Sequence, residues 1–128
     1  MNSTSPSKAM VYGGYAASVL PVLVLLMSAT MKLTHNPEMA QQFRDKLGYQ
    51  ESIATPLGIV EVLCTLLYCI PQTSVLGAIL LTGYLGGAVA THVRVGDPPF
   101  LPLAVGIFVW IGLFLRDARI RELLPLRK

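Results

Sequence analysis

The hydrophobic pattern of the chain consists of four long apolar runs separated by short polar stretches. The runs span residues 11–31, 53–70, 74–91 and 99–115, and Glu61 is the only charged residue within them. A transmembrane helix needs about 17–25 apolar residues, whereas barrel strands would alternate polar and apolar positions. Helices also satisfy their own backbone hydrogen bonds in lipid. We therefore predict an all-α, integral membrane four-helix bundle.

The first apolar run follows Lys8, as the core of a cleaved signal peptide would. It is longer than the usual core of about 7–15 residues, and no small-x-small cleavage site ends it. We therefore expect an uncleaved first span. The expected organisation is a disordered tail over residues 1–10, one membrane domain over 11–116, and a basic cytoplasmic tail over 117–128.

The longest polar connection, residues 32–52, carries the signals of a short amphipathic helix between spans one and two. Asn-Pro-Glu at positions 36–38 supplies a capping side chain, a proline at the first position and an acid in the first turn. Met39, Phe43 and Leu47 recur at a spacing of four and share one face. We expect this helix at the membrane surface, either as a lid over the bundle mouth or as a simple cap on loop backbone.

The distribution of basic residues predicts the orientation of the chain. Six Lys and Arg residues flank the spans on the side of the two termini, and four lie on the other side. The excess favours termini in the cytoplasm, with the chain in the bacterial cytoplasmic (inner) membrane. The net charge of +3 gives no argument for nucleic acid, because the basic residues are mostly accounted for by topology.

Glu61 is the first candidate for a functional residue. A charged side chain within the bilayer costs about 3 kcal/mol or more unless it finds a partner. Topology places Glu61 roughly 12 Å deep in the same half of the bundle as Lys32, His92 and Arg94, with Tyr84 level with it or deeper. These five residues form the predicted ligand-binding or proton-handling cluster.

The same residues have a structural interpretation. Lys32, His92 and Arg94 lie at the ends of spans, where charged side chains commonly face water or headgroups. Glu61 could then belong to a buried ion pair that only holds helices together. Both interpretations place Glu61 in the same half of the bundle as Lys32, His92 and Arg94.

Several kinds of chemistry are disfavoured. Cys64 and Cys69 lie five positions apart on one predicted helix, so they point in different directions and are unsuited to a disulfide. With His35 and His92 as the only histidines, we expect no zinc or bis-histidine haem site.

Two glycines in the third run suggest a helix contact. Gly83 and Gly87 form a small-xxx-small pair, which lets another helix backbone approach closely. That neighbour could belong to this chain or to a second copy, so a homo-oligomer is a candidate assembly.

Five short segments carry a set of motifs in a fixed order. They are Ser-Ala-Thr-Met-Lys-Leu at 28–33, Leu-Gly-Tyr at 47–49, Gly-Ile-Val-Glu at 58–61, Gly-Tyr-Leu-Gly-Gly-Ala-Val-Ala-Thr-His-Val-Arg at 83–94, and Gly-Asp-Pro at 96–98. Together they resemble the DoxX-like family of small four-helix membrane proteins, over nearly the whole chain.

The resemblance implies a function class. Some members of the family are described as subunits of quinone-linked sulfur oxidoreductases or as partners in membrane oxidoreductase complexes. The chain is then expected to be a membrane subunit or accessory of such a complex. It would bind a quinone or another lipophilic small molecule in a polar pocket around Glu61 and work with a membrane or soluble redox partner.

Two alternatives stay open at this stage. Related members act as assembly factors or cargo receptors with no known catalysis, so the chain could be a non-catalytic binding protein. A small proton-coupled exporter can also have four helices and one membrane glutamate. That alternative ranks third, because the polar groups gather in one half of the bundle instead of at its midplane.

Overall fold

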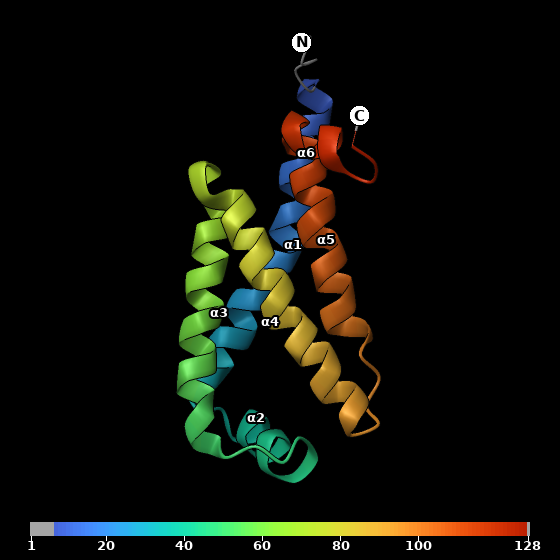
Figure 1. Ribbon diagram of the computed structural model, residues 1–128. Coiled ribbons are helices and arrows are strands. Elements are labelled where there is room, and N and C mark those ends of the chain that lie inside the picture. Colours follow the sequence, from blue (N-terminus) through green and yellow to red (C-terminus); the bar gives the residue numbers. More distant parts are fainter. Residues whose placement is uncertain (1–6, 128) are drawn as a thin grey trace.

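The computed structural model of the chain describes residues 7–127, and these residues contain helices and no strand. Four helices make up the bundle in Figure 1: α1 (Lys8–Leu33), α3 (Ala54–Cys69), α4 (Ser74–Arg94) and α5 (Phe100–Arg116). The predicted all-α class is confirmed. Of the tail expected over residues 1–10, residues 1–6 lie outside the described part of the chain, and residues 8–10 belong to α1.

Length and composition suit these helices to a lipid environment. Three helical stretches are long and apolar enough to cross a membrane: Lys8–Leu33, Glu51–Cys69 and Pro71–Arg94. The helix α5 is also apolar but shorter. Each of the four helices carries large exposed apolar side chains, for example Leu20, Leu63, Ile79 and Ile107. Such surfaces are costly in water and match the acyl chains of a bilayer.

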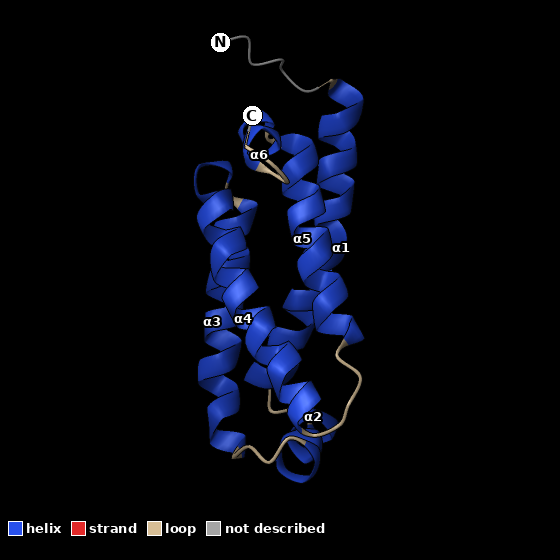
Figure 2. Cartoon of the chain, turned by 45° about the vertical axis from the view of Figure 1, so that its right-hand side comes forward, coloured by secondary structure: helices blue, strands red, loops and turns tan. Residues whose placement is uncertain are grey.

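The four helices form a ring in which α1 contacts α3 and α5, and α4 contacts the same two helices. Both ends of the described chain lie at one end of the bundle (Figure 1). At that end α1 runs beside α5, and α3 joins α4 through a short turn. Toward the opposite end, α3 diverges from α4 and α1 diverges from α5, and α2 lies across that end (Figures 1 and 2).

Close backbone contact holds the terminus end together. A Cβ atom added to Gly77 of α4 would meet the backbone of Tyr68 in α3. A Cβ atom on Gly14 of α1 would lie 2.9 Å from the carbonyl oxygen of Gly112 in α5. Glycine at these positions therefore allows the helices to pack at a distance that larger residues would prevent.

Tyr68 links three helices at this end, and sequence reasoning did not identify it. Its side chain is fully buried, and its hydroxyl donates to the carbonyl oxygen of Val109 at 2.7 Å. The Oγ atom of Ser18 lies 3.0 Å from the same hydroxyl. The Arg116 guanidinium stacks 4.8 Å from the ring centroid and donates to the Tyr68 carbonyl oxygen at 3.5 Å. Arg116 thus supports the C-terminal end of α3, where helix carbonyls lack partners.

The connection between α1 and α3 begins with α2 (Pro37–Gln41), which continues into a π-helical turn, Gln42–Lys46. The Asn36 side chain accepts hydrogen bonds from the backbone amides of Glu38 at 3.0 Å and Met39 at 3.3 Å, so the helix starts where the sequence predicts. The predicted apolar face, formed by Met39, Phe43 and Leu47, is buried. Gly48 follows with φ of 72°, a left-handed conformation that glycine adopts easily.

The C-terminal segment carries one more helix, α6 (Ala118–Leu123). Asp117 caps it by accepting a hydrogen bond from the Arg119 amide at 3.0 Å. The side-chain hydrogen bond from Arg119 also lowers the pKa of the Asp117 carboxyl below its usual range. Part of the tail expected over residues 117–128 is therefore helical.

Gly77→Ala should loosen the contact between α3 and α4, because the new methyl group would meet backbone atoms of Tyr68. Overpacking of this kind costs about 1–3 kcal/mol, so the thermal unfolding midpoint in detergent should fall by several degrees. Gly86→Ala is the matched control, since no described residue comes within 4 Å of its Cβ position. An equal fall in both variants would contradict the close-contact explanation.

Candidate functional site

A buried ion pair joins α1 to α3. Glu61 is 2% exposed, and its Oε1 atom accepts a hydrogen bond from the Lys32 ammonium at 3.0 Å. The same ammonium donates to the Ser28 Oγ atom at 2.6 Å. The predicted partner for the isolated carboxylate is therefore present, and it comes from the end of the first long helix.

Local sequence explains why these two side chains can meet. Gly58 lies one turn before Glu61 on α3, at the point where α1 crosses. A Cβ atom added there would lie 2.9 Å from Leu33 Cγ and 3.2 Å from Lys32 Cβ. Glycine at this position lets α1 approach closely enough for the Lys32 side chain to reach the carboxylate. The Gly-x-x-Glu spacing thus has a packing reason.

The ion pair lies on the wall of a cavity of 470 Å³. Its lining comes from α1, α3, α4, α5 and the segment that follows α2. The lining is mainly apolar, and its polar side chains are Ser28, Lys32, Tyr49, Glu61, Tyr84, Thr91 and His92. A mainly apolar cavity of this size, with a few convergent polar groups, is typical of small-molecule sites.

Two predicted site residues of α4 also face this cavity. The Lys32 ammonium lies 5.9 Å from the centroid of the Tyr84 ring, within the range of a cation–π contact. His92 donates from Nδ1 to the carbonyl oxygen of Ala88 at 2.7 Å. In the neutral ring this bond fixes Nδ1 as the protonated nitrogen and leaves Nε2 as the acceptor.

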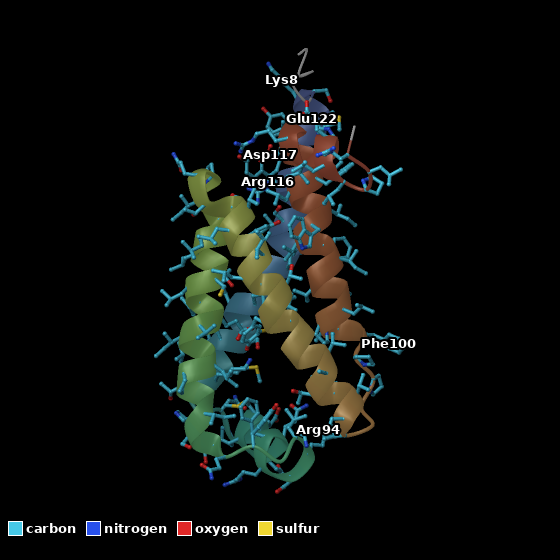
Figure 3. All side chains as sticks on the ribbon, in the orientation of Figure 1. Lys8, Arg94, Phe100, Arg116, Asp117 and Glu122 are labelled. Carbon is cyan, nitrogen blue, oxygen red and sulfur yellow. The ribbon has the colours of Figure 1, made fainter. Side chains whose placement is uncertain are left out.

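The fifth predicted residue, Arg94, is not part of the cavity lining. Its guanidinium donates to the carbonyl oxygen of Leu47 at 2.6 Å and lies 5.8 Å from the Tyr49 ring centroid. In Figure 3, Arg94 lies beside α2, at the end of the bundle opposite Arg116. Arg94 therefore anchors the connection between α1 and α3 to the end of α4.

This connection covers one end of the cavity. We call residues 36–49 the cover segment; its Phe43, Leu47 and Tyr49 side chains line the cavity. The Tyr49 hydroxyl lies 2.7 Å from Thr91 Oγ1 on α4, which adds a second anchor beside Arg94. Sequence reasoning noted Tyr49 only as part of a family motif, because nothing near it in the chain predicts its partner 42 positions away.

The cavity brings together four kinds of polar side chain. It combines a cation, a carboxylate, an imidazole and a phenol within apolar walls. Within residues 7–127, no group of three or more His, Cys, Asp and Glu side chains is placed to hold a metal ion.

An all-helical chain of this kind, with apolar helices long enough to cross a bilayer and an ion pair buried between two of them, is a small membrane protein. Residues 16–113 match the profile of the DoxX-like family, so the chain belongs to that family. The match reaches from α1 into α5 and confirms the resemblance drawn from the motifs. No curated protein and no solved structure matches the chain significantly.

Removing either partner of the ion pair should destabilise the bundle. Lys32→Met or Glu61→Leu leaves one charge buried without its partner, which typically costs about 3–5 kcal/mol. The double variant should lose much less free energy of unfolding than the sum of the losses in the two single variants. Chemical unfolding in mixed micelles measures these losses. The more exposed pair between Lys46 and Asp97, at 3.6 Å, is the control and should show coupling below about 1 kcal/mol. Additive losses at Lys32 and Glu61 would contradict the pairing.

Arg94→Leu should release the cover segment, because the Leu47 carbonyl oxygen loses its donor. We expect faster hydrogen exchange at the backbone amides of residues 43–49. Arg44→Leu is the matched control, since Arg44 is exposed and lies 3.8 Å from Glu51 at the surface. Equal exchange in the wild type and in Arg94→Leu would show that other contacts hold this segment.

Proposed function

We propose that this DoxX-like membrane protein binds a quinone, or a similar lipophilic molecule with a carbonyl headgroup, in the cavity beside Glu61. It would serve as a membrane subunit or accessory of an oxidoreductase complex. The observation that carries the proposal is the buried Lys32–Glu61 pair on the wall of an otherwise mainly apolar cavity of 470 Å³.

The charge arrangement favours a neutral ligand over an ion. Glu61 balances the Lys32 ammonium, so an added anion would meet a carboxylate and an added cation would meet an ammonium. An ammonium has three N–H donors, and the described contacts of Lys32 use two of them, toward Ser28 and Glu61. The third donor remains for a carbonyl oxygen in the cavity.

Residues in the cavity lining would also transfer protons to the bound quinone. Conversion of a quinone to a quinol takes up two electrons and two protons; the redox partner would supply the electrons. Glu61 and the Nε2 atom of His92 lie in the cavity lining and are the groups that we propose for transferring these protons. His92 lies near the end of α4 and would exchange protons with water.

The proposed topology follows the charge count and the helix lengths. All four bundle helices would cross the membrane, with the cover segment at the outer surface. Both termini would then lie in the cytoplasm of a bacterial cell, beside the basic residues Arg116, Arg119 and Arg121. The membrane domain would cover residues 11–116, followed by the basic segment 117–128.

One observation favours a second candidate, a non-catalytic assembly or binding protein. The Lys32–Glu61 pair joins α1 to α3 whether or not a ligand is present, so stability alone could explain it. In that case the cavity would hold lipid chains with no preference for a carbonyl headgroup.

Binding of tritiated decylubiquinone to the purified protein tests the proposal. We expect saturable binding that weakens about tenfold or more in Lys32→Met, because a hydrogen bond from a charged donor is worth about 1.5–3 kcal/mol. Lys46→Met is the matched control, since its ammonium lies at the surface and pairs with Asp97.

Two results would contradict the proposal. One is binding that does not saturate, and the other is equal affinity in the wild type and in a folded Lys32→Met variant. Proton-driven export from liposomes that disappears in Glu61→Gln would instead favour a transporter.

A further inference from the structure

The cover segment lies over the end of the cavity that is farther from the two ends of the described chain. Phe43 and Leu47 line the cavity, and each is only 6% exposed. Arg94 and Thr91 hold this segment against α4 through the contacts with Leu47 and Tyr49. A ligand cannot pass this end unless the cover segment moves.

The exposed residues of the cavity lining are found in two places. Gly83 and Gly87 lie on α4, and Pro98 and Leu101 lie at the start of α5. In the described part of the chain, nothing lies within 4 Å of a Cβ position at either glycine, so the cavity wall carries no side chain there. At the start of α5, the large Leu101 side chain occupies the wall. The cavity wall at Gly83 and Gly87 is therefore less obstructed by side chains than the wall at the start of α5.

Helix geometry shows which side of α4 the glycines occupy. Thr82 accepts a hydrogen bond from Trp110 of α5 at 2.7 Å, and Gly86, one turn later, borders the groove beside α5. Gly83 and Gly87 follow these positions by one residue each, which turns them by about 100° around the helix axis. They therefore lie on the other edge of α4, where α3 diverges from it in Figure 1.

The glycines also lie at a depth that lipid would occupy. Gly87 precedes Arg94 by about 10 Å along the helix, at a rise of about 1.5 Å per residue, and Gly83 lies a further turn inside. The neighbouring outer face of α3 carries exposed apolar residues, Val60 and Leu63 among them. An opening here would face acyl chains instead of water.

We infer that the cavity is loaded sideways from the hydrocarbon layer, through a window between α3 and α4 whose α4 edge is Gly83 and Gly87. The inference rests on the proposed function, because it assigns the window to the lipophilic molecule that the cavity would bind. Such a molecule reaches the window by diffusion within the bilayer, with its headgroup leading toward Lys32. The cover segment then stays closed throughout.

The glycine pair has a different interpretation, which the experiment must separate. A small-xxx-small pair can dock a second copy of the chain, as the sequence suggested for Gly83 and Gly87. A second copy would shield the window and bury the glycines. Closing the window with a larger side chain would then change the oligomeric state.

A reporter thiol tests the window without any quinone. Val24→Cys places a thiol on the α1 wall of the cavity, in a background with Cys64→Ala and Cys69→Ala. In proteoliposomes, lipid-soluble N-pyrenylmaleimide should label this thiol faster than a charged, water-soluble maleimide does. Gly87→Leu should slow the lipid-soluble reagent about tenfold or more. Gly86→Leu is the matched control, since Gly86 is equally free of neighbours but does not line the cavity, and it should leave the rate unchanged.

A second measurement follows decylubiquinone in the same glycine variants. Gly87→Leu should slow association and dissociation together, and Gly86→Leu should change neither rate. The wild type could bind no decylubiquinone while the thiol shows the expected labelling rates. That result would contradict the proposed quinone binding and support the window between α3 and α4. If the quinone binds but Gly87→Leu alters neither labelling nor binding rates, the window fails and the binding proposal stands.

Three further results would overturn the window. The first is equal or faster labelling by the charged maleimide, which would place the entrance at the cover segment. The second is slowing by Leu101→Trp with none by Gly87→Leu, which would place it between α1 and α5. The third is loss of a cross-linked dimer in Gly87→Leu with unchanged labelling, which would make the glycines a contact between copies.

Discussion

The ion pair between Lys32 and Glu61 determines how α1 lies against α3. Within residues 7–127, each of these charges has the other as its only partner of opposite sign. Because an unpaired charge in the bilayer is costly, the two helices must keep the register that holds the ammonium 3.0 Å from the carboxylate. Gly58 makes that register sterically accessible, and Ser28 satisfies a second N–H of the ammonium. The same pair supplies the polar wall of the cavity.

The remainder of the fold divides into a tight end and an open end. Gly77 and Gly112 bring helix backbones together near the termini, and Tyr68 with Arg116 fills the space between them. At the other end the helices diverge, and the cover segment closes the space that they leave. The tight end therefore fixes the helix directions, and the divergence that follows creates the cavity at the level of the ion pair.

Sequence periodicity and charge were sufficient to predict the long apolar helices, although not α6, and the shared location of Lys32, Glu61, Tyr84 and His92, because span order decides which helix ends meet. The role of Arg94 could not be predicted, since its acceptor, the Leu47 carbonyl oxygen, depends on the path of a loop. Tyr68 was missed because its partners lie on other helices. Gly83 and Gly87 matched a helix-contact motif, yet no atom of another element in residues 7–127 lies within 4 Å of their Cβ positions. Contacts between residues that are far apart in the chain produce no recognisable pattern in the neighbouring sequence.

The central claim is that the Lys32 ammonium, held by Glu61, donates a hydrogen bond to a carbonyl oxygen in the cavity. Isotope-edited infrared spectroscopy of bound decylubiquinone, labelled with carbon-13 at one carbonyl, measures this bond directly. The claim predicts that one C=O stretch moves to lower frequency in the wild type and returns to the value of the free quinone in Lys32→Met. Carbonyl frequencies equal to those of the free quinone in the bound wild type would contradict it.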